Sequence, residues 1–310
     1  MTTGMTSDMT SVAAASAATA GLRDAIAAAT ATLTGAGIDS ARTDAELLAA
    51  HIAGIERGRL ALVTDVRADF LERYQRAVEI RARRVPLQHI TGTAAFGPVD
   101  LDVGPGVFIP RPETEALLEW AAARDLPPRP VIVDLCTGSG ALAVALAVCH
   151  DRARVIAIDD DPVALRYARR NARRHARRNT ASMAAPAVQV LQCDVTDSDL
   201  LPGLDGTVDL VVANPPYIPA GADLEPEVAQ HDPEHALFGG QDGMALIGPI
   251  ARHAARWLTD GGWLALEHDD TTSEATKQTI ADTGAFGDIV AHDDLTGRPR
   301  FVTARRTRRR

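Results

Sequence analysis

A short polar segment with two prolines, Asn214-Pro215-Pro216-Tyr217, follows the apolar run VDLVVA over 208–213. The apolar run is typical of a buried strand. Proline has no N–H to donate to a sheet, and the residue before a proline is held extended, so the strand must end with Asn214 at its tip. Asn-Pro also starts ordinary turns. Whether the segment carries chemistry therefore depends on what the other strand ends place beside it.

A loop with two glycines lies at the end of another predicted strand. The sequence Asp134-Leu135-Cys136-Thr137-Gly138-Ser139-Gly140 follows the run VIV and opens an apolar helical pattern. The glycines permit a tight turn and a close approach of backbone to ligand, and the helix start offers free N–H groups. Asp159 ends the next apolar run, VIAID, at roughly the 20-residue distance where an acidic side chain meets a ribose diol. Together these residues predict a nucleoside-binding edge.

Two cofactors compete for this edge. The run from Gly138 to Ala143 also satisfies the looser dinucleotide fingerprint. The carboxylate of Asp134 would repel a pyrophosphate, but it suits the positive sulfonium and ammonium groups of S-adenosylmethionine. A third predicted strand ends near Asp194 and Val195, where Asp194 could accept from an adenine amino group with Val195 against the ring. The residues favour S-adenosylmethionine, with S-adenosylhomocysteine as product, over NAD.

The elements that must position these residues alternate between strands and helices from 130 onward. The runs VIVDL, VIAID, VQVLQCD, VDLVVAN and WLALE predict strands buried on both faces of a parallel sheet. Helical patterns between them predict a doubly wound, Rossmann-like α/β domain over 110–304. Ligands bind such sheets at the carboxyl ends of the strands near the topological switch point, so Asn214 is expected beside the nucleoside.

The chain before this domain has a different character. Helical periodicity over 21–86 predicts a small all-α bundle, and short β-like runs between glycines predict a β-hairpin linker over 87–109. The first twenty residues are mostly small or hydroxylated, which predicts disorder over 1–20. The arginines of 305–310 predict a frayed basic tail.

Composition limits the class of protein. The chain has 310 residues, of which 46% are hydrophobic, and a net charge of −9, which argues against a surface built to bind nucleic-acid backbones. The arginines of 164–178 are explained by a solvated helix face, with an RNA-binding strip as the alternative. The three cysteines are scattered, and no signal peptide or membrane-spanning run is evident. We expect a cytoplasmic monomer with neither nucleic acid nor membrane as partner.

The tetrapeptide at 214–217 resembles the acceptor motif of methyltransferases that act on planar nitrogens, either the exocyclic amines of bases or the side-chain amide of glutamine. The delocalised lone pair of such a nitrogen attacks weakly, so the NH2 group must be held in line with the S–CH3 bond. Asn214 Oδ1 and the Pro215 carbonyl can each accept one N–H, while Tyr217 stacks on the planar group. The prolines, Pro216 included, hold the carbonyls rigid.

Further segments occur in the expected order over 86–303 and resemble the peptide chain release factor N5-glutamine methyltransferase family. That resemblance implies a class I methyltransferase domain with a seven-stranded, mostly parallel sheet, preceded by a small substrate-contacting domain. It also implies methylation of the glutamine in the Gly-Gly-Gln motif of class 1 release factors, which tunes translation termination. The chain departs from the family pattern at Asp232 and Asp269. The segments are IPRPETE, DLCTGSG, VIAIDDDPVALRYARRNA, NPPYIP, DPEHALFGGQDG, GGWLALEH and DLTGRPRFV.

Several alternatives share parts of this pattern. A glutamine methyltransferase of a ribosomal protein has NPPY but is not expected to have an unbroken PRPETE. An adenine-N6 methyltransferase needs a basic target-recognition domain. A non-catalytic scaffold that binds the cofactor has no need of NPPY. Arg111 of PRPETE is either a cofactor-side residue or an ion-pair partner of Glu113. His231 and His235 are four residues apart, but Pro233 between them disfavours a shared helix face, so no metal site is predicted.

Overall fold

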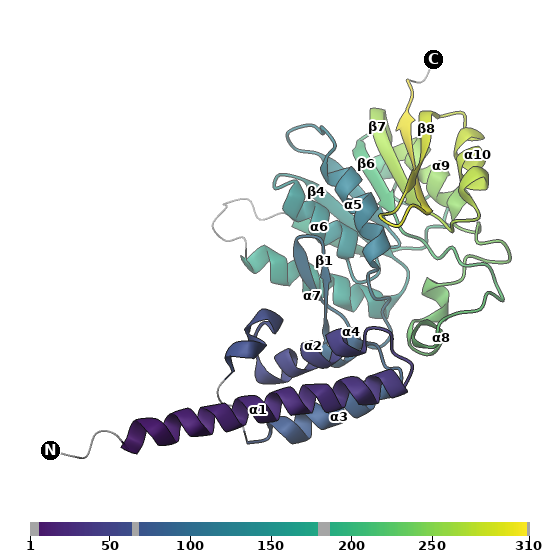
Figure 1. Cartoon of the computed structure of the whole chain (residues 1–310). Coiled ribbons are helices and arrows are strands. Elements are labelled where there is room, and N and C mark those ends of the chain that lie inside the picture. The colour runs from purple at the N-terminus through teal and green to yellow at the C-terminus, as the bar shows by residue number, and fades with distance from the viewer. Residues whose placement is uncertain (1–5, 64–67, 179–186, 309–310) are drawn as a thin grey trace. The chain divides into compact units, whose positions relative to one another are not determined.

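The computed structural model describes residues 6–63, 68–178 and 187–308, without the side chains of 6–20, 177, 178 and 187. The chain divides into two compact units, Met1–Gly92 and Thr93–Arg310 (Figure 1). Because each unit has its own core, each is described by itself.

The first unit is built from helices. They are α1 (Thr6–Gly35), α2 (Ala41–Ala53), the 3-10 helix η1 (Arg57–Leu62), α3 (Phe70–Ala82) and α4 (Leu87–Thr91). Leu33, Leu48 and Phe70, one from each of the three long helices, are buried in a common core. A buried ion pair between Arg81 Nε and Asp44 Oδ2, 2.7 Å apart, ties α3 to α2. The helical character predicted for 21–86 agrees with this unit.

The disorder predicted for 1–20 differs from the structure, because α1 begins at Thr6. Residues 6–20 therefore continue the helix that was expected to start near Gly21. Alanine has the highest intrinsic helix propensity, and this stretch is rich in alanine. The remaining part of that prediction, residues 1–5, lies outside the described residues.

The predicted hairpin opens the second unit. Strands β1 (Thr93–Phe96) and β2 (Val99–Asp102) pair antiparallel. The linker predicted over 87–109 also contains a helical turn, α4, which ends at Gly92 in the left-handed conformation with a φ of 74°. Glycine adopts this conformation without the steric penalty of a Cβ, which explains why the helix stops there.

A seven-stranded sheet forms the centre of the second unit. Its spatial order is β5-β4-β3-β6-β7-β9-β8. The first five strands in this order are parallel, and β9 runs antiparallel to both β7 and β8. The chain reverses its direction of travel between β3 and β6, so this is the topological switch point. The strands are β3 (Val131–Leu135), β4 (Arg154–Asp159), β5 (Ala187–Gln192), β6 (Val208–Ala213), β7 (Leu258–Glu267), β8 (Phe286–Asp293) and β9 (Pro299–Arg306).

Helices cover both faces of the sheet (Figure 1). Neighbouring strand residues alternate between the two cores: Ile132 packs with α5 (Glu115–Ala122), α6 (Ala141–Cys149) and α7 (Pro162–Arg178), whereas Val133 packs with α9 (Ile247–Trp257) and α10 (Ser273–Ala281). Because both faces are buried, the strands are continuously apolar, as expected from the sequence. Short connections complete the unit: η2 (Pro112–Thr114), η3 (Pro202–Leu204), α8 (Pro226–His231) and η4 (Glu234–Ala236).

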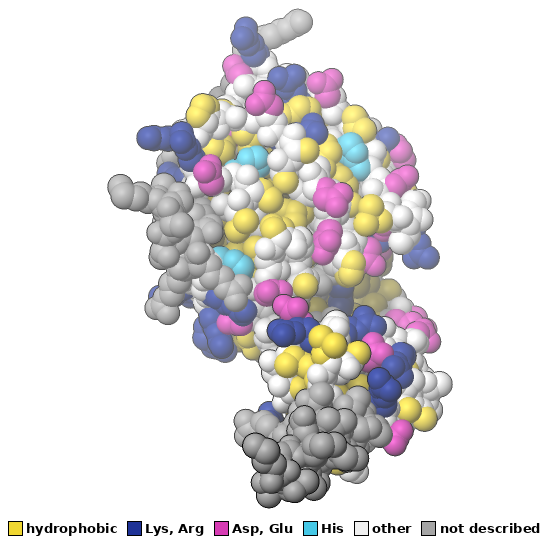
Figure 2. All heavy atoms as spheres, turned by 60° about the vertical axis from the view of Figure 1, so that its left-hand side comes forward, with side chains coloured by type: hydrophobic (Ala, Val, Ile, Leu, Met, Phe, Trp, Pro, Cys, Tyr) yellow, Lys and Arg dark blue, Asp and Glu magenta, His cyan; other side chains and the backbone are white. Residues whose placement is uncertain are grey.

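The two arginine-rich segments have structural partners. On α7, Arg170 Nε lies 2.6 Å from Asp102 Oδ2, opposite the buried stripe of Ala164, Leu165 and Ala168. The frayed tail predicted from 305 begins too early, because β9 continues to Arg306, whose buried side chain donates from Nη1 to the Ala285 carbonyl at 2.8 Å. On the face shown in Figure 2, basic side chains are interspersed with acidic ones.

None of the helices within the described residues is both long enough and apolar enough to cross a bilayer.

Candidate active site

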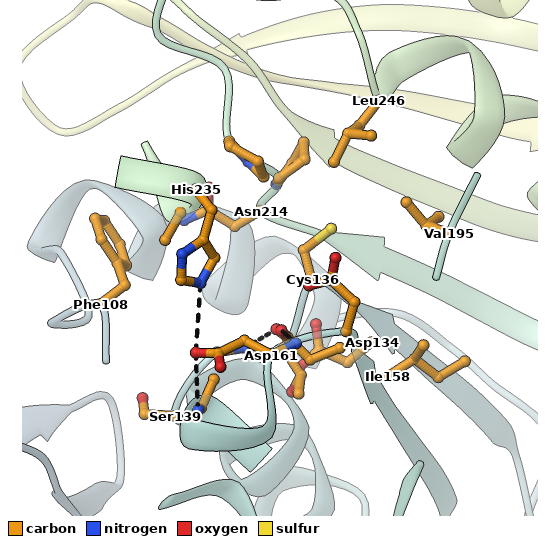
Figure 3. Close-up of a pocket in the computed structure, with 18 of the residues that line it drawn as sticks. Phe108, Asp134, Cys136, Ser139, Ile158, Asp161, Val195, Asn214, His235 and Leu246 are labelled. Atoms are coloured by element: carbon orange, nitrogen blue, oxygen red, sulfur yellow. Dashed lines mark hydrogen bonds and ion pairs between the residues drawn. The ribbon is translucent and has the colours of Figure 1, made fainter. Parts of the chain in front are cut away.

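A cavity of about 310 Å³ lies at the carboxyl ends of β3, β4, β5 and β6 (Figure 3). Its volume falls in the range of small-molecule sites. Its wall includes most of the residues predicted for the nucleoside edge together with the whole tetrapeptide at 214–217, so the two predicted parts of the site share one cavity. The predicted residues on the wall are Asp134, Cys136, Thr137, Gly138, Ser139, Asp159, Asp194, Val195, Asn214, Pro215, Pro216 and Tyr217.

Gly140, predicted to bind cofactor, is not on the wall of the cavity. It precedes α6 with a φ of 85°, and a Cβ at this position would lie 3.2 Å from the Cα of Ala168 on α7. The glycine is therefore required by backbone conformation and by the close approach of two helices.

Arg111, also predicted on the cofactor side, pairs with Asp232. Its Nη2 bonds Asp232 Oδ2, and its guanidinium lies 4.9 Å from the centre of the Phe108 ring. The ion-pair partner in the described chain is thus Asp232 and not Glu113, while the contact with the cofactor stays a prediction. Because Phe108 lines the cavity and Asp232 precedes η4, Arg111 joins two parts of the cavity rim. Burial raises the pKa of Asp232 even though Arg111 opposes that shift.

The side chain of Asp134 is buried at the cavity wall, and only one of its two carboxylate oxygens is hydrogen-bonded. Its Oδ2 accepts from Thr137 Oγ1 at 2.5 Å and from the Ala143 backbone N–H at 3.0 Å. Its Oδ1 has no hydrogen-bond partner within the described part of the chain. Burial raises the pKa of Asp134 to about 7. A buried, unsatisfied carboxylate oxygen is costly, so this atom is suited to a positively charged ligand group.

Asp159 organises the glycine loop from the end of β4. Its carboxylate accepts from the Gly138 N–H at 2.8 Å and from the Asp161 N–H at 3.0 Å. These bonds hold the loop against the strand tip, a structural role that the sequence did not predict, while the contact of Asp159 with a ribose stays a prediction. Desolvation raises the pKa of Asp159 despite both hydrogen bonds.

Asp161 and His235 were not predicted as parts of the site. Asp161 accepts from the N–H groups of Val163 and Ala164 at the start of α7, and His235 Nε2 lies 3.3 Å from its Oδ2. Figure 3 shows this contact and the two residues on the cavity wall. The run of three aspartates at 159–161 was the available signal, since such residues cap a following helix.

The cavity wall is strongly acidic at the nucleoside edge. Of the residues that line it, five are aspartates, none is Lys or Arg, and His235 is the single histidine. This charge disfavours a pyrophosphate and favours a cation. Burial and the surrounding carboxylates hold the pKa of the Cys136 thiol well above its usual value, so Cys136 stays neutral. The five aspartates are Asp134, Asp159, Asp160, Asp161 and Asp194.

Asn214 has its amide direction set by a neighbour. Its Nδ2 donates to Thr114 Oγ1 at 3.0 Å. Because the NH2 end of the amide is used in this bond, Oδ1 is the atom that remains to accept from a substrate. Sequence reasoning missed Thr114, although it stands within the PRPETE segment that carried the resemblance.

Tyr217 contributes its ring to the cavity wall while its hydroxyl is tied to buried groups. The hydroxyl donates to Glu267 Oε1 at 2.9 Å and accepts from Arg300 Nη1 at 3.4 Å. Burial and the adjacent Glu267 raise the pKa of Tyr217, so the hydroxyl stays protonated. Glu267 was also missed; its signal was the single charged side chain at the end of the apolar run WLALE.

A glycine-containing segment packs directly on the tetrapeptide. A Cβ on Gly243 would lie 2.2 Å from the Tyr217 carbonyl oxygen, and one on Gly239 would lie 2.5 Å from that of Pro216. Ile218 and Phe238 form a β-bridge between the two segments. The glycines therefore allow a second chain segment to fix the backbone of the tetrapeptide.

The histidine pair at 231 and 235 does not form a metal site in this structure. Over the ranges that the structure describes, no three His, Cys, Asp or Glu side chains are grouped to hold a metal ion.

Comparison with known proteins identifies the family. Residues 24–92 match the PrmC N-terminal domain, and residues 105–236 match the methyltransferase small domain. A release factor glutamine methyltransferase of Mycolicibacterium smegmatis is 62% identical over 93% of this chain and 99% of its own length. The chain belongs to the release factor glutamine methyltransferase family. The methyltransferase fold and the resemblance stated from the motifs are thereby confirmed.

Two further proteins are similar to this chain. A protein of Mycobacterium tuberculosis with the same name as the first is 58% identical over 92% of this chain and 91% of its own length. A 4-amino-L-phenylalanine/4-methylamino-L-phenylalanine methyltransferase of Streptomyces pristinaespiralis is 43% identical over 80% of this chain and 82% of its own. The release factor glutamine methyltransferase family thus has a relative named for an aromatic amine.

Proposed function

We propose that this protein methylates the side-chain amide nitrogen of the glutamine in the Gly-Gly-Gln motif of class 1 release factors, with S-adenosylmethionine as methyl donor. The observation that carries the proposal is the orientation of Asn214, whose Nδ2 is held by Thr114 so that Oδ1 remains as an acceptor. Family members 58–62% identical over nearly the whole chain and named for this activity support the substrate. We place the reaction in the cytoplasm and assign it to the monomer.

The acidic edge of the cavity fits S-adenosylmethionine. The unpaired, buried Oδ1 of Asp134 suits its cationic amino-acid moiety, Asp159 its ribose hydroxyls, and Asp194 with Val195 its adenine. When bound, this cofactor supplies a methyl group on a positively charged sulfur, open to attack by a nucleophile. No lysine or arginine among the lining residues would meet a pyrophosphate, which supports this cofactor over a dinucleotide.

The tetrapeptide then orients the amide for transfer. Asn214 Oδ1 and the Pro215 carbonyl accept one N–H each, which turns the nitrogen toward the methyl group and increases its electron density. Transfer would form a bond between the amide nitrogen and the methyl carbon and would leave the bonding pair on the sulfur of the donor. The nitrogen would release its proton to solvent only after methylation had made it cationic, so the site needs no strong base. Tyr217 contributes its ring to the wall beside the planar group.

The test uses the full chain with S-adenosylmethionine labelled in the methyl group. Each class 1 release factor is offered in its normal form and with Ala in place of the glutamine of Gly-Gly-Gln. We expect label on the normal factor alone, in the peptide that contains this motif. Equal label on the Ala form, or label only on a ribosomal protein offered in parallel, would contradict the proposal and favour the ribosomal alternative.

A second substrate class follows from the relative named for 4-amino-L-phenylalanine. An aromatic NH2 is also planar and offers two N–H groups, so Asn214 could orient it in the same way. Free 4-amino-L-phenylalanine therefore forms a further arm of the assay. Faster methylation of this amine than of the release factors would make it the better candidate.

A further inference from the structure

Two buried polar residues contact the tetrapeptide from distant segments, η2 and the end of β7. Thr114, on the cavity wall, is 4% exposed, and Glu267 is fully buried. Thr114 bonds Asn214, and Glu267 bonds Tyr217. Fully buried carboxylates are rare unless they are paired, so Glu267 requires an explanation.

The hydrogen bonds of these residues have a fixed direction. A threonine hydroxyl has one proton, and because Oγ1 of Thr114 accepts from Asn214, that proton must be donated elsewhere. The Thr114 hydroxyl lowers the pKa of the Glu267 carboxyl against the effect of burial, so we infer that its proton points toward this carboxylate. Glu267 Oε1 also accepts from the Tyr217 hydroxyl at 2.9 Å. An ionised carboxylate has no proton to donate, so both hydroxyls must point toward it.

We propose that Thr114 and Glu267 are positioning residues, which fix the Asn214 amide so that its oxygen, and not its NH2 group, faces the glutamine to be methylated. With the amide reversed, Asn214 would present N–H groups to the substrate NH2, and donor would oppose donor. In this proposal Glu267 orients Thr114, and Thr114 orients Asn214. The same Glu267 carboxylate also holds Tyr217.

Glu267 is retained at this position although its burial costs stability. Its Oε2 is buried without a hydrogen-bond partner in the described chain, and burial raises its pKa to about 7. The charges around it are opposed: Arg300 favours the ionised form, whereas Glu113 disfavours it. Arg300 is itself held by Asp294, with its Nη2 3.1 Å from Asp294 Oδ2. Because the burial of Glu267 costs stability, we expect this residue to orient its neighbours more than to stabilise the fold.

This inference rests on the proposed function, and its first test is a double-mutant cycle between Thr114 and Asn214. Thr114→Val should lower kcat by about five- to thirtyfold, the effect of one lost hydrogen bond, while leaving affinity for S-adenosylhomocysteine unchanged. Thr114→Ser keeps the hydroxyl and should restore most of the rate. In an Asn214→Ala background, Thr114→Val should have almost no further effect, because Thr114 acts through Asn214.

Thr276→Val is the matched control, since Thr276 is fully buried on α10 and, within the described residues, its hydroxyl bonds only Met244 Sδ, at 3.7 Å. It removes the same group from another buried site and should leave kcat unchanged. An effect of Thr114→Val that is undiminished by Asn214→Ala, or a rate not restored by serine, would overturn the inference. If the wild-type protein fails to methylate any release factor, the proposed function fails instead, which separates the two results.

Glu267→Gln provides a second, independent test. Glutamine has nearly the same shape but adds a donor toward Thr114, so kcat should fall by about tenfold. Because an ionised buried carboxylate is removed, the thermal midpoint at pH 8 should be equal or higher. A lower midpoint with wild-type kcat would show a merely structural role and contradict the inference.

Discussion

The two ends of the cavity achieve their selectivity in different ways. At the predicted nucleoside end, five aspartates create a field that favours a cation, and Asp159 and Asp161 are fixed by backbone N–H groups no more than 21 residues away in sequence. At the acceptor end, the substrate group is neutral, and Asn214 is fixed by a side chain 100 residues away. A loop at the strand ends is enough to favour a positively charged ligand. The orientation of the Asn214 side-chain amide, in contrast, depends on a contact between distant segments of the chain.

The largest effect is expected at the acceptor end. Asn214→Ala removes the oxygen that orients the nucleophile, so kcat should fall by about 10²- to 10³-fold, comparable to the loss of one oriented group that stabilises a transition state. Affinity for S-adenosylhomocysteine, measured by calorimetry, should not change. Asn214→Asp keeps an acceptor oxygen and should retain more activity than the alanine variant. Turnover by Asn214→Ala close to wild type would remove the distinction between the two ends.

The next effect concerns the nucleoside end. Asp134→Asn removes the charge beneath the cationic part of the cofactor, and affinity for S-adenosylmethionine should fall by about 10- to 100-fold, as expected for a lost charge-assisted hydrogen bond. Asp260→Asn is the matched control, because it makes the same change in charge at an exposed position on β7. Equal losses in both variants would show that overall charge, and not this site, governs binding.

The pH dependence of S-adenosylmethionine binding also tests the role of Asp134. Burial raises the pKa of Asp134 from 3.8 to about 7, so the free protein gains the ionised form as the pH passes through 7. A cation prefers that form, and affinity for S-adenosylmethionine should therefore rise by about tenfold between pH 6 and pH 8 and then level off. The rise should be lost in Asp134→Asn. Affinity that falls over this interval would contradict the assignment.

The smallest expected effect is on protein stability, through the glycine loop at the nucleoside end of the cavity. Gly140→Ala introduces a Cβ at a φ of 85° against α7, which should lower the free energy of unfolding by about 1–3 kcal/mol. Gly138→Ala meets the same conformational penalty at a φ of 56°, but nothing lies within 4 Å of the added Cβ. Chemical denaturation should thus show a smaller loss for Gly138→Ala. Equal losses would show that contact with α7 is not what requires Gly140.

The sequence predicted the nucleoside end better than the acceptor scaffold. Asp134, Gly138 and Asp159 follow from strand, loop and helix patterns that are local, so their place on the cavity wall could be inferred. The ion-pair partner of Arg111 was not predicted, since Asp232 lies 121 residues further along the chain. Local patterns carry no information about such pairing.

Two other differences have separate origins, one long-range and one local. Glu267 and Tyr217 are 50 residues apart, and only the pairing of β6 with β7 brings the end of each strand to the same edge. At the N-terminus, low apolar content suggested disorder over 6–20, whereas the helix propensity of alanine decided the observed conformation. A contact between distant residues decides the first case, and a local backbone propensity decides the second.

The most direct test of the central claim is a structure of this protein with S-adenosylhomocysteine and a peptide that contains Gly-Gly-Gln. The account predicts the cofactor sulfur at the acidic end, and the glutamine side-chain nitrogen within hydrogen-bond distance of both Asn214 Oδ1 and the Pro215 carbonyl oxygen. The Thr114 hydroxyl should still accept from Asn214 Nδ2 in that complex. A glutamine bound elsewhere, or an Asn214 that presents its NH2 group to the substrate, would contradict the account.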